Sequence, residues 1–150
     1  MEKIIFEKYD EDYLELSWQW LNDPEIKELT QTPDFTREQQ RAWFDSLAER
    51  KDYMVWGINV NNTKIGVAGL KNINDKEAEY FGYIGAKEYW SKGLSRPILD
   101  FIKQEASRLG LNRIYLKVSA RNPRAVKAYQ NNGFIVEHTQ YDLVFMQYFL

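Results

Sequence analysis

The stretch from Tyr89 to Pro97 places a glycine between an extended segment and a helical pattern. The first N–H groups of a helix lack intrahelical partners, and together with the positive end of the helix dipole they bind anions. Gly93 allows a positive φ and close backbone approach, and Pro97 in the first turn gives up no hydrogen bond. The pattern predicts a phosphate cradle, and the alternative is a plain turn in which Ser95 caps the helix.

Two further details of this loop narrow its chemistry. Arg96 puts a cation beside the positive end of the dipole, a conflict of about 0.3–1 kcal/mol that a bound anion would offset. Neither G-x-G-x-x-G nor G-x-x-x-x-G-K-[ST] occurs in the chain, so this is neither a dinucleotide fingerprint nor a P-loop. Dehydrogenase and kinase functions are therefore disfavoured.

Two glutamates precede the loop within a predicted strand at 77–85. Alternation places Glu77, Glu79, Phe81 and Tyr83 on one face of that strand. Burial would raise the pKa of one of these carboxylates toward neutrality, where it can act as a general base. The alternative is that both are solvated charges at a strand edge. His138, the single histidine, lies near no hydrolase or metal-site constellation in the sequence, so no metal site is predicted.

The elements that position these residues follow from periodicity and turn signals. The capping box Thr36-Arg37-Glu38-Gln39 opens a helix, and an Asn61-Asn62 turn joins two strands. Strands are predicted at 4–7, 53–60, 64–70, 77–85 and 113–119, with two more within 134–149. Helices are predicted from Asp10, from Thr36, over 98–109 and over 122–131. Residues 25–29 are predicted to form only a helical turn, so the early part of the chain has one pair of helices, those that begin at Asp10 and Thr36.

Composition bounds the class of protein. The 150 residues fit one domain, 1–150, with one core, because no repeat or linker divides the chain. A formal charge of −2 without a basic block argues against nucleic acid as a partner. The chain has no cysteine, no apolar run that would span a membrane and no secretory layout at its first residues, so we expect a cytoplasmic protein, monomer or homodimer.

A second motif, C-terminal to the glycine loop, completes a pattern that is typical of a known family. Residues Asn122 to Phe134 read N-x-x-A-x-x-x-Y-x-x-x-G-F after a strand. Together with the Lys92-Gly93 loop, this pattern resembles the GNAT N-acetyltransferase superfamily over nearly the whole chain. Trp90 resembles the W-x-K-G loop of ribosomal-protein acetyltransferases, although most of the family has Gln or Arg there, and Gly or Ala where this chain has Ser95.

The resemblance implies an α/β (α+β) fold with a mixed, mostly antiparallel sheet of six to seven strands and about four helices. It also implies acetyl-CoA as cofactor and acetyl transfer to a primary amine by direct attack. Asn122 either holds the amide arm of the cofactor or caps the helix, or does both. The cofactor-binding residues it implies are Tyr83, Ile84, Gly85, Trp90, Ser91, Lys92, Gly93, Leu94, Ser95, Arg96, Asn122, Ala125 and Tyr129.

The chemistry of amine acetylation suggests roles for two residues. An ammonium of pKa ~10.4 is only about a thousandth neutral at pH 7, so a base is required. Glu79 matches the position of the family's catalytic glutamate, with Glu77 as the competitor. Tyr129 fits the acid that protonates the departing thiolate, and its alternative role is packing of the helix on the sheet.

The acceptor is predicted to be a small-molecule amine, such as an amino sugar or a nucleotide-linked amino sugar. Candidate acceptor contacts are Trp18, Trp20, Glu77 and Phe81, although core packing is an alternative for the tryptophans. One rival function is acetylation of a protein N-terminus. Others are a non-catalytic acyl-CoA-binding domain, and an interaction module that pairs through an exposed strand edge near residues 145–149.

Overall fold

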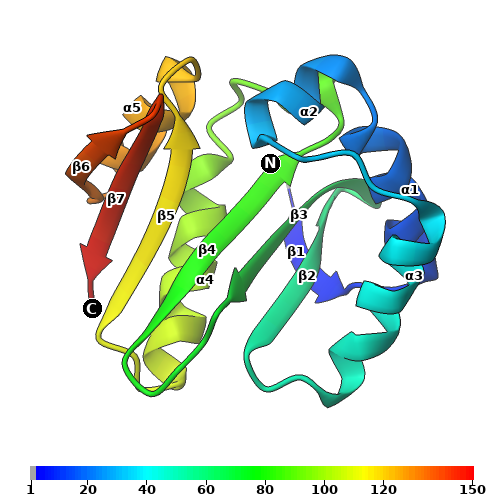
Figure 1. The fold of residues 1–150 in the computed structure, drawn as a ribbon, viewed down its shortest axis with the longest axis horizontal. Helices are drawn as coiled ribbons and strands as arrows, with labels where there is room; N and C mark the ends of the chain where they lie inside the picture. Colours follow the sequence, from blue (N-terminus) through cyan, green and yellow to red (C-terminus); the bar gives the residue numbers. More distant parts are fainter. Residues whose placement is uncertain (1–2) are drawn as a thin grey trace.

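The computed structural model describes residues 3–150, and a seven-stranded sheet forms its centre (Figure 1). The strand order is β1-β2-β3-β4-β5-β7-β6. All neighbouring strands are antiparallel except β4 and β5, which are parallel. The strands are β1 (Ile4–Lys8), β2 (Tyr53–Val60), β3 (Thr63–Lys71), β4 (Glu77–Ile84), β5 (Arg113–Ser119), β6 (Ile135–Gln140) and β7 (Leu143–Phe149). The expected mixed, mostly antiparallel sheet is confirmed.

In the described part of the chain five α-helices accompany the sheet: α1 (Glu11–Leu21), α2 (Pro24–Thr30), α3 (Arg37–Ser46), α4 (Ser95–Arg108) and α5 (Pro123–Asn131). Two short 3-10 turns, η1 (Leu47–Glu49) and η2 (Lys87–Tyr89), follow α3 and β4. The sequence predicted one early helical pair, and the structure has three helices there. The segment expected to be a single turn is a full helix because the Asp23 carboxylate accepts the N–H groups of Glu25 and Ile26, and Pro24 suits its first position.

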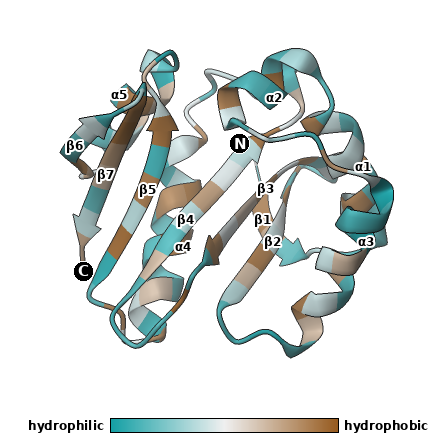
Figure 2. Cartoon of the chain, in the orientation of Figure 1, coloured by the Kyte–Doolittle hydropathy of each residue, from teal (hydrophilic) through white to brown (hydrophobic). Residues whose placement is uncertain are grey.

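The two faces of the sheet carry different helices. In Figure 1 α4 runs behind the sheet, while α1, α2 and α3 lie together at the other end of the molecule. The larger core cluster joins Ile98, Leu99 and Ile102 of α4 to the sheet, and the smaller one is built around Tyr9 and Tyr13. Apolar and polar segments alternate along β5 in Figure 2, as expected for a strand with one covered face.

The local signals at α3 and at the first hairpin behave as predicted. The Thr36 hydroxyl accepts the Gln39 N–H, and the Gln39 side chain accepts the Thr36 N–H, which completes the capping box. Asn61 and Asn62 take φ values of 50° and 70°, the left-handed pair that a two-residue hairpin turn requires. These turns fix the register of β2 against β3.

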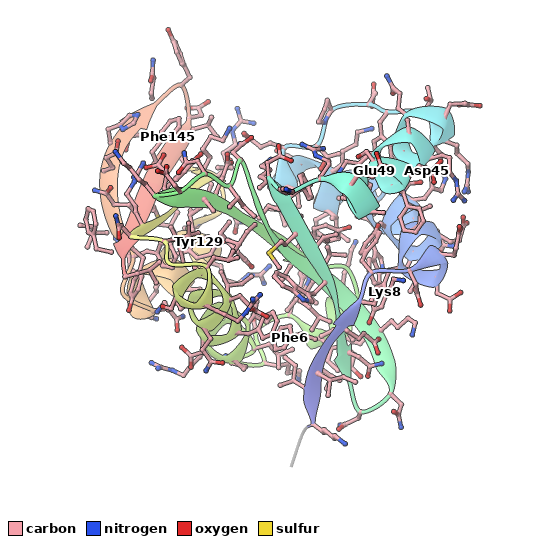
Figure 3. All side chains as sticks on the ribbon, turned by 90° about the horizontal axis from the view of Figure 1, so that it is seen from below. Phe6, Lys8, Asp45, Glu49, Tyr129 and Phe145 are labelled. Atoms are coloured by element: carbon pink, nitrogen blue, oxygen red, sulfur yellow. The ribbon has the colours of Figure 1, made fainter. Side chains whose placement is uncertain are left out.

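The edges of the sheet differ from expectation. The strand proposed as an exposed pairing edge, near residues 145–149, is β7, which lies between β5 and β6 with partners on both sides. That expectation was wrong because β6 turns back through Tyr141 and Asp142 and covers the outer side of β7. Figure 3 shows Phe145 of β7 on the face away from α4, and Phe6 of β1 on the α4 side, where it stacks on Phe101 at 4.0 Å. No helix within residues 3–150 is long and apolar enough to cross a membrane.

Candidate functional site

The site lies where the sheet opens between its two parallel strands. Pairing of β4 with β5 is confined to Glu77–Arg113, Ala78–Ile114 and Glu79–Tyr115. Beyond these pairs β4 continues beside β3 to Ile84, and β5 continues beside β7 to Ser119. A cleft of about 870 Å³ occupies the opening and reaches both faces of the sheet. One ligand can therefore enter from the α4 side while another enters from the α1–α3 side.

The loop before α4 forms the cradle at one mouth of the cleft. Ser91 and Gly93 have φ values of 59° and 76°, and among residues 3–150 no atom beyond the chain neighbours of Gly93 lies within 4 Å of where its Cβ would be. Leu94 occupies the N-cap position and provides no side-chain hydrogen bond, so Ser95 is the first helical residue and not the cap. Leu94 and Ser95 line the cleft, so the start of α4 lies at its wall with no hydrogen bond from the N-cap side chain, and its first N–H groups could hold an anion such as pyrophosphate.

Arg124 of α5 crosses to this loop, a contact that the sequence did not suggest. Its guanidinium lies 4.8 Å from the centre of the Trp90 ring, and its Nη1 is 3.4 Å from the Ser91 hydroxyl. Trp90 in turn donates its indole N–H to the carbonyl of Ile84 at 2.7 Å. These contacts tie β4, the loop and α5 together. They also add a cation at the cradle, next to Lys92, which lines the same cleft.

The open edge of β4 provides backbone groups to the cleft. Gly85 donates its N–H to Ile65 of β3 at 2.8 Å, so by alternation the backbone groups of Gly82 and Ile84 point the other way, toward β5. The Ile84 carbonyl accepts the Trp90 indole N–H, which leaves the Gly82 groups and the Ile84 N–H for a ligand. An amide-bearing arm can pair with them as an added strand would. On the facing side, Asn122 caps α5 by accepting the Ala125 N–H at 3.3 Å, and its NH₂ group remains a donor.

Tyr129 packs beside the inner end of this passage. Its ring makes an edge contact with Tyr80 at 6.1 Å and a tilted contact with Phe134 at 5.9 Å. Burial raises the pKa of Tyr129 to about 12 and raises that of Tyr80 well above its usual value. Both phenols therefore keep their protons at neutral pH and can donate to an anion formed in the cleft.

Glu79 lies at the point where the strands part. Only 5% of the residue is exposed, its Oε1 accepts the Asn72 amide N–H at 3.1 Å, and the Lys117 ammonium lies 3.7 Å from its Oε2. Glu77, the competing candidate, lies two residues earlier and pairs with Arg113 at 3.2 Å. Glu79 lines the cleft, whereas Glu77 is not among its lining residues. A base at Glu79 would therefore face the ligands.

The remaining predicted residues divide between the cleft and its surroundings. Those lining the cleft are Phe81, Tyr83, Ile84, Trp90, Ser91, Lys92, Gly93, Leu94, Ser95, Asn122, Ala125 and Tyr129. Gly85, Arg96, Trp18 and Trp20 are not among the lining residues. Trp20 packs on Gly85, where a Cβ would meet its ring at 2.0 Å. Trp18 lies between Phe35 and Arg37, at 5.2 and 4.5 Å.

The mouth on the α1–α3 side is walled by aromatic residues, of which the sequence analysis named Phe81 as an acceptor contact but not Tyr53 or Tyr9. Tyr53 lies between Trp43 and Phe81, at ring distances of 5.8 and 5.3 Å, and all three line the cleft. Tyr9 lines it too, and donates its hydroxyl to Ser17 at 2.7 Å. Their grouping depends on strand register and on the placement of α3, which no local pattern encodes.

Comparisons with known proteins find similar sequences and similar folds. Residues 3–135 match the acetyltransferase (GNAT) domain family. Acetyltransferase PseH of Campylobacter jejuni is 24% identical over 132 residues, 87% of this chain and 82% of that protein. Its structure in complex with acetyl coenzyme A superposes with a TM-score of 0.73 at 20% identity, over 98% of this chain and 97% of that one.

Two other proteins share the architecture. Spermidine N(1)-acetyltransferase of Vibrio cholerae is 37% identical over 76 residues, 49% of this chain and 43% of that protein. Its complex with CoA and spermine superposes with a TM-score of 0.87 at 20% identity, over 97% and 95% of the two chains. A domain from Methanocaldococcus jannaschii reaches a TM-score of 0.88 at 21% identity, with both chains covered completely.

Proposed function

The chain belongs to the GNAT acetyltransferase family, and from that membership we propose that it transfers the acetyl group of acetyl-CoA to a primary amine of a small molecule, such as an amino sugar. The observation that carries the proposal is the cleft itself. It joins the cradle before α4 to Glu79 through the opening between β4 and β5. A donor and an acceptor can thus meet inside the sheet, as direct transfer requires.

The cofactor half of the proposed site consists of the residues around the cradle. The α4 N–H groups, Lys92 and Arg124 would hold the pyrophosphate, and the free edge of β4 with Asn122 would hold the amide arm. Bound acetyl-CoA supplies a thioester carbonyl to the amine and leaves as a thiolate. Tyr129 holds a phenolic proton beside that passage and transfers it to the sulfur.

On the acceptor side, Glu79 takes the proton that the ammonium must lose. The amine then attacks with its lone pair, the C–N bond forms and the C–S bond breaks. The nitrogen loses two protons in all. Glu79 takes the first and later releases it to solvent, and the second, lost as the amide forms, replaces the proton that Tyr129 gives to the sulfur. Burial of Glu79 and its Asn72 hydrogen bond hold the carboxylate in one orientation toward the cleft.

A coupled measurement of binding and turnover tests this proposal. Acetyl-CoA at about 100 times its dissociation constant should add about 2.7 kcal/mol of stability, which ATP and NAD should not reproduce. Release of free CoA is then followed with amino sugars, polyamines and N-terminal peptides as acceptors. Selective stabilisation with turnover of a small amine supports the proposal. Turnover of peptides alone would move the acceptor to protein N-termini, and stabilisation without any turnover would indicate a binding domain.

A further inference from the structure

Basic side chains predominate among the charged residues that line the cleft: four are basic and one is acidic. They are Lys71, Glu79, Lys92, Lys117 and Arg124. Lys92 and Arg124 belong to the phosphate cradle, where cations are expected. Lys71 and Lys117 belong to β3 and β5, on the acceptor side, and there they face a single carboxylate.

Both lysines flank Glu79 on the same face of the sheet. Lys71 is the direct cross-strand partner of Glu79, and its ammonium lies 5.7 Å from the centre of the Phe81 ring. Lys117 lies two residues beyond Tyr115, the β5 partner of Glu79, and its Nζ is 3.7 Å from the Glu79 carboxylate. By alternation Lys71, Glu79 and Lys117 therefore project toward the α1–α3 side.

The nearby acids are engaged elsewhere. Glu77 pairs with Arg113 at 3.2 Å, and Arg121 lies 3.6 Å from Glu28 and 3.4 Å from Asp142. None of these three acids is among the lining residues of the cleft. The acceptor side therefore has a surplus of one positive charge, because Lys117 already balances Glu79.

This surplus decides what kind of amine the cleft accepts. A polyamine brings further ammonium groups, which would meet two lysines and a carboxylate that already has a partner. An acceptor with one amine and an anionic group would place its amine at Glu79 and its anion between the lysines. Resting on the acetyl transfer proposed above, we propose that Lys71 and Lys117 form an anion subsite, so that the acceptor carries a phosphate or carboxylate besides its amine.

The surroundings of the subsite agree with an acceptor that has a flat or ring-shaped body. Trp43, Tyr53 and Phe81 form a continuous aromatic wall beside Lys71. Such a wall covers the apolar face of a ring, while the lysines hold its anionic group. The lysines also favour the neutral form of the attacking amine, since like charges disfavour an ammonium.

The test compares acceptors on protein whose phosphate cradle is kept occupied, by saturating CoA for the unfolding midpoints and by saturating acetyl-CoA for turnover. The probes are glucosamine, glucosamine 6-phosphate, 5-aminovalerate and spermidine. The variants are Lys71→Met, Lys117→Met and their double, with Lys76→Met, an exposed lysine outside the cleft, as the control. The readouts are the unfolding midpoint with each probe and kcat/KM with acetyl-CoA.

We expect an anionic probe to stabilise the protein more than glucosamine or spermidine does, with kcat/KM about ten- to a hundredfold above that of glucosamine. Each substitution of Lys71 or Lys117 should lower the ratio of kcat/KM for the anionic probe to kcat/KM for glucosamine. Lys76→Met should leave that ratio unchanged. A higher unfolding midpoint and kcat/KM with glucosamine 6-phosphate would identify a phosphate subsite. The same increases with 5-aminovalerate would identify a carboxylate subsite.

Three outcomes overturn the subsite: a preference for spermidine, no shift with either anionic probe, or a ratio that the lysine substitutions leave intact. A protein that CoA itself fails to stabilise contradicts the proposed acetyl transfer instead, so the two failures are distinguishable.

Discussion

Glu79 combines burial with polar contacts on both of its carboxylate oxygens. Asn72 donates to one oxygen, and the Lys117 ammonium approaches the other. A carboxylate held in this way is oriented without being sealed from the cleft, which it lines. Glu77 has the same residue type on the same face, but its position beside Arg113 puts it where β4 and β5 are still paired.

Replacing Glu79 by Gln should remove the base while keeping a hydrogen-bond acceptor for Asn72. We expect kcat to fall by about 10²–10⁴-fold, the usual contribution of a general base, with CoA affinity unchanged. The matched control is Glu77→Gln, which should retain kcat and lose at most about 1 kcal/mol of stability, as for a partly exposed ion pair. Equal activity of the two variants would contradict the assignment.

Tyr129→Phe isolates the phenolic proton from the packing of the ring. The ring contacts with Tyr80 and Phe134 remain, so stability and CoA affinity should change little. We expect kcat to fall by about 10²-fold, at the lower end of the range for a general acid. Tyr80→Phe is the comparison, because Tyr80 lines the same cleft. Loss of turnover in that variant alone would make Tyr80 the acid.

At the scale of elements, the cradle depends on contacts among three segments. Trp90 fastens the loop to the end of β4, and Arg124 of α5 stacks on the same indole. The loop is therefore held in its positive-φ conformation by neighbours as well as by Gly93. A substitution in α5 should for this reason alter the conformation of the loop at the start of α4.

Arg124→Met should weaken cofactor binding and leave the chemistry intact. We expect the dissociation constant for CoA to rise about tenfold, with kcat at saturation unchanged, because a charged hydrogen-bond donor is lost from the cradle. Titration calorimetry with CoA and dephospho-CoA checks this, and an equal loss for both ligands locates the contact at the pyrophosphate. Arg108→Met, at the exposed far end of α4, is the control.

The elements themselves were largely predictable, because their signals are local. The Thr36–Gln39 capping box, the Asn61-Asn62 turn and the glycine of the cradle each act within a few residues. The aromatic wall around Tyr53 and the approach of Arg124 to Trp90 join residues far apart in sequence, and only register and helix placement bring them together. The interior position of β7 escaped prediction for the same reason.

For the whole molecule, buried tyrosines make stability depend on alkaline pH. Desolvation raises the pKa of Tyr9 and of Tyr129 to about 12, against about 10 in the unfolded chain. The folded state therefore holds these protons more tightly than the unfolded state does. Their contribution is complete below pH 10 and is lost as the pH rises toward 12.

Urea unfolding between pH 9 and about 12 measures this loss, which we expect to be on the order of 2 kcal/mol for each tyrosine. Tyr9→Phe should flatten the alkaline slope, although loss of its hydrogen bond to Ser17 costs about 1 kcal/mol at neutral pH. Tyr141→Phe, at an 88% exposed position, should leave the slope unchanged. An unaltered slope in Tyr9→Phe would contradict the assignment.

The three residue pairs that join β4 to β5 make the middle of the sheet a narrow isthmus. On one side stand β1 to β4, and on the other β5 to β7, and within each group neighbouring strands share at least five residue pairs. A molecule bound in the gap supplies hydrogen bonds to β4 and β5 where the two strands do not pair with each other. It therefore connects the two halves of the sheet as well as reacting there. Amide exchange in β5 and β7 should then slow together with that in β4 when CoA binds, although the cradle itself lies before α4.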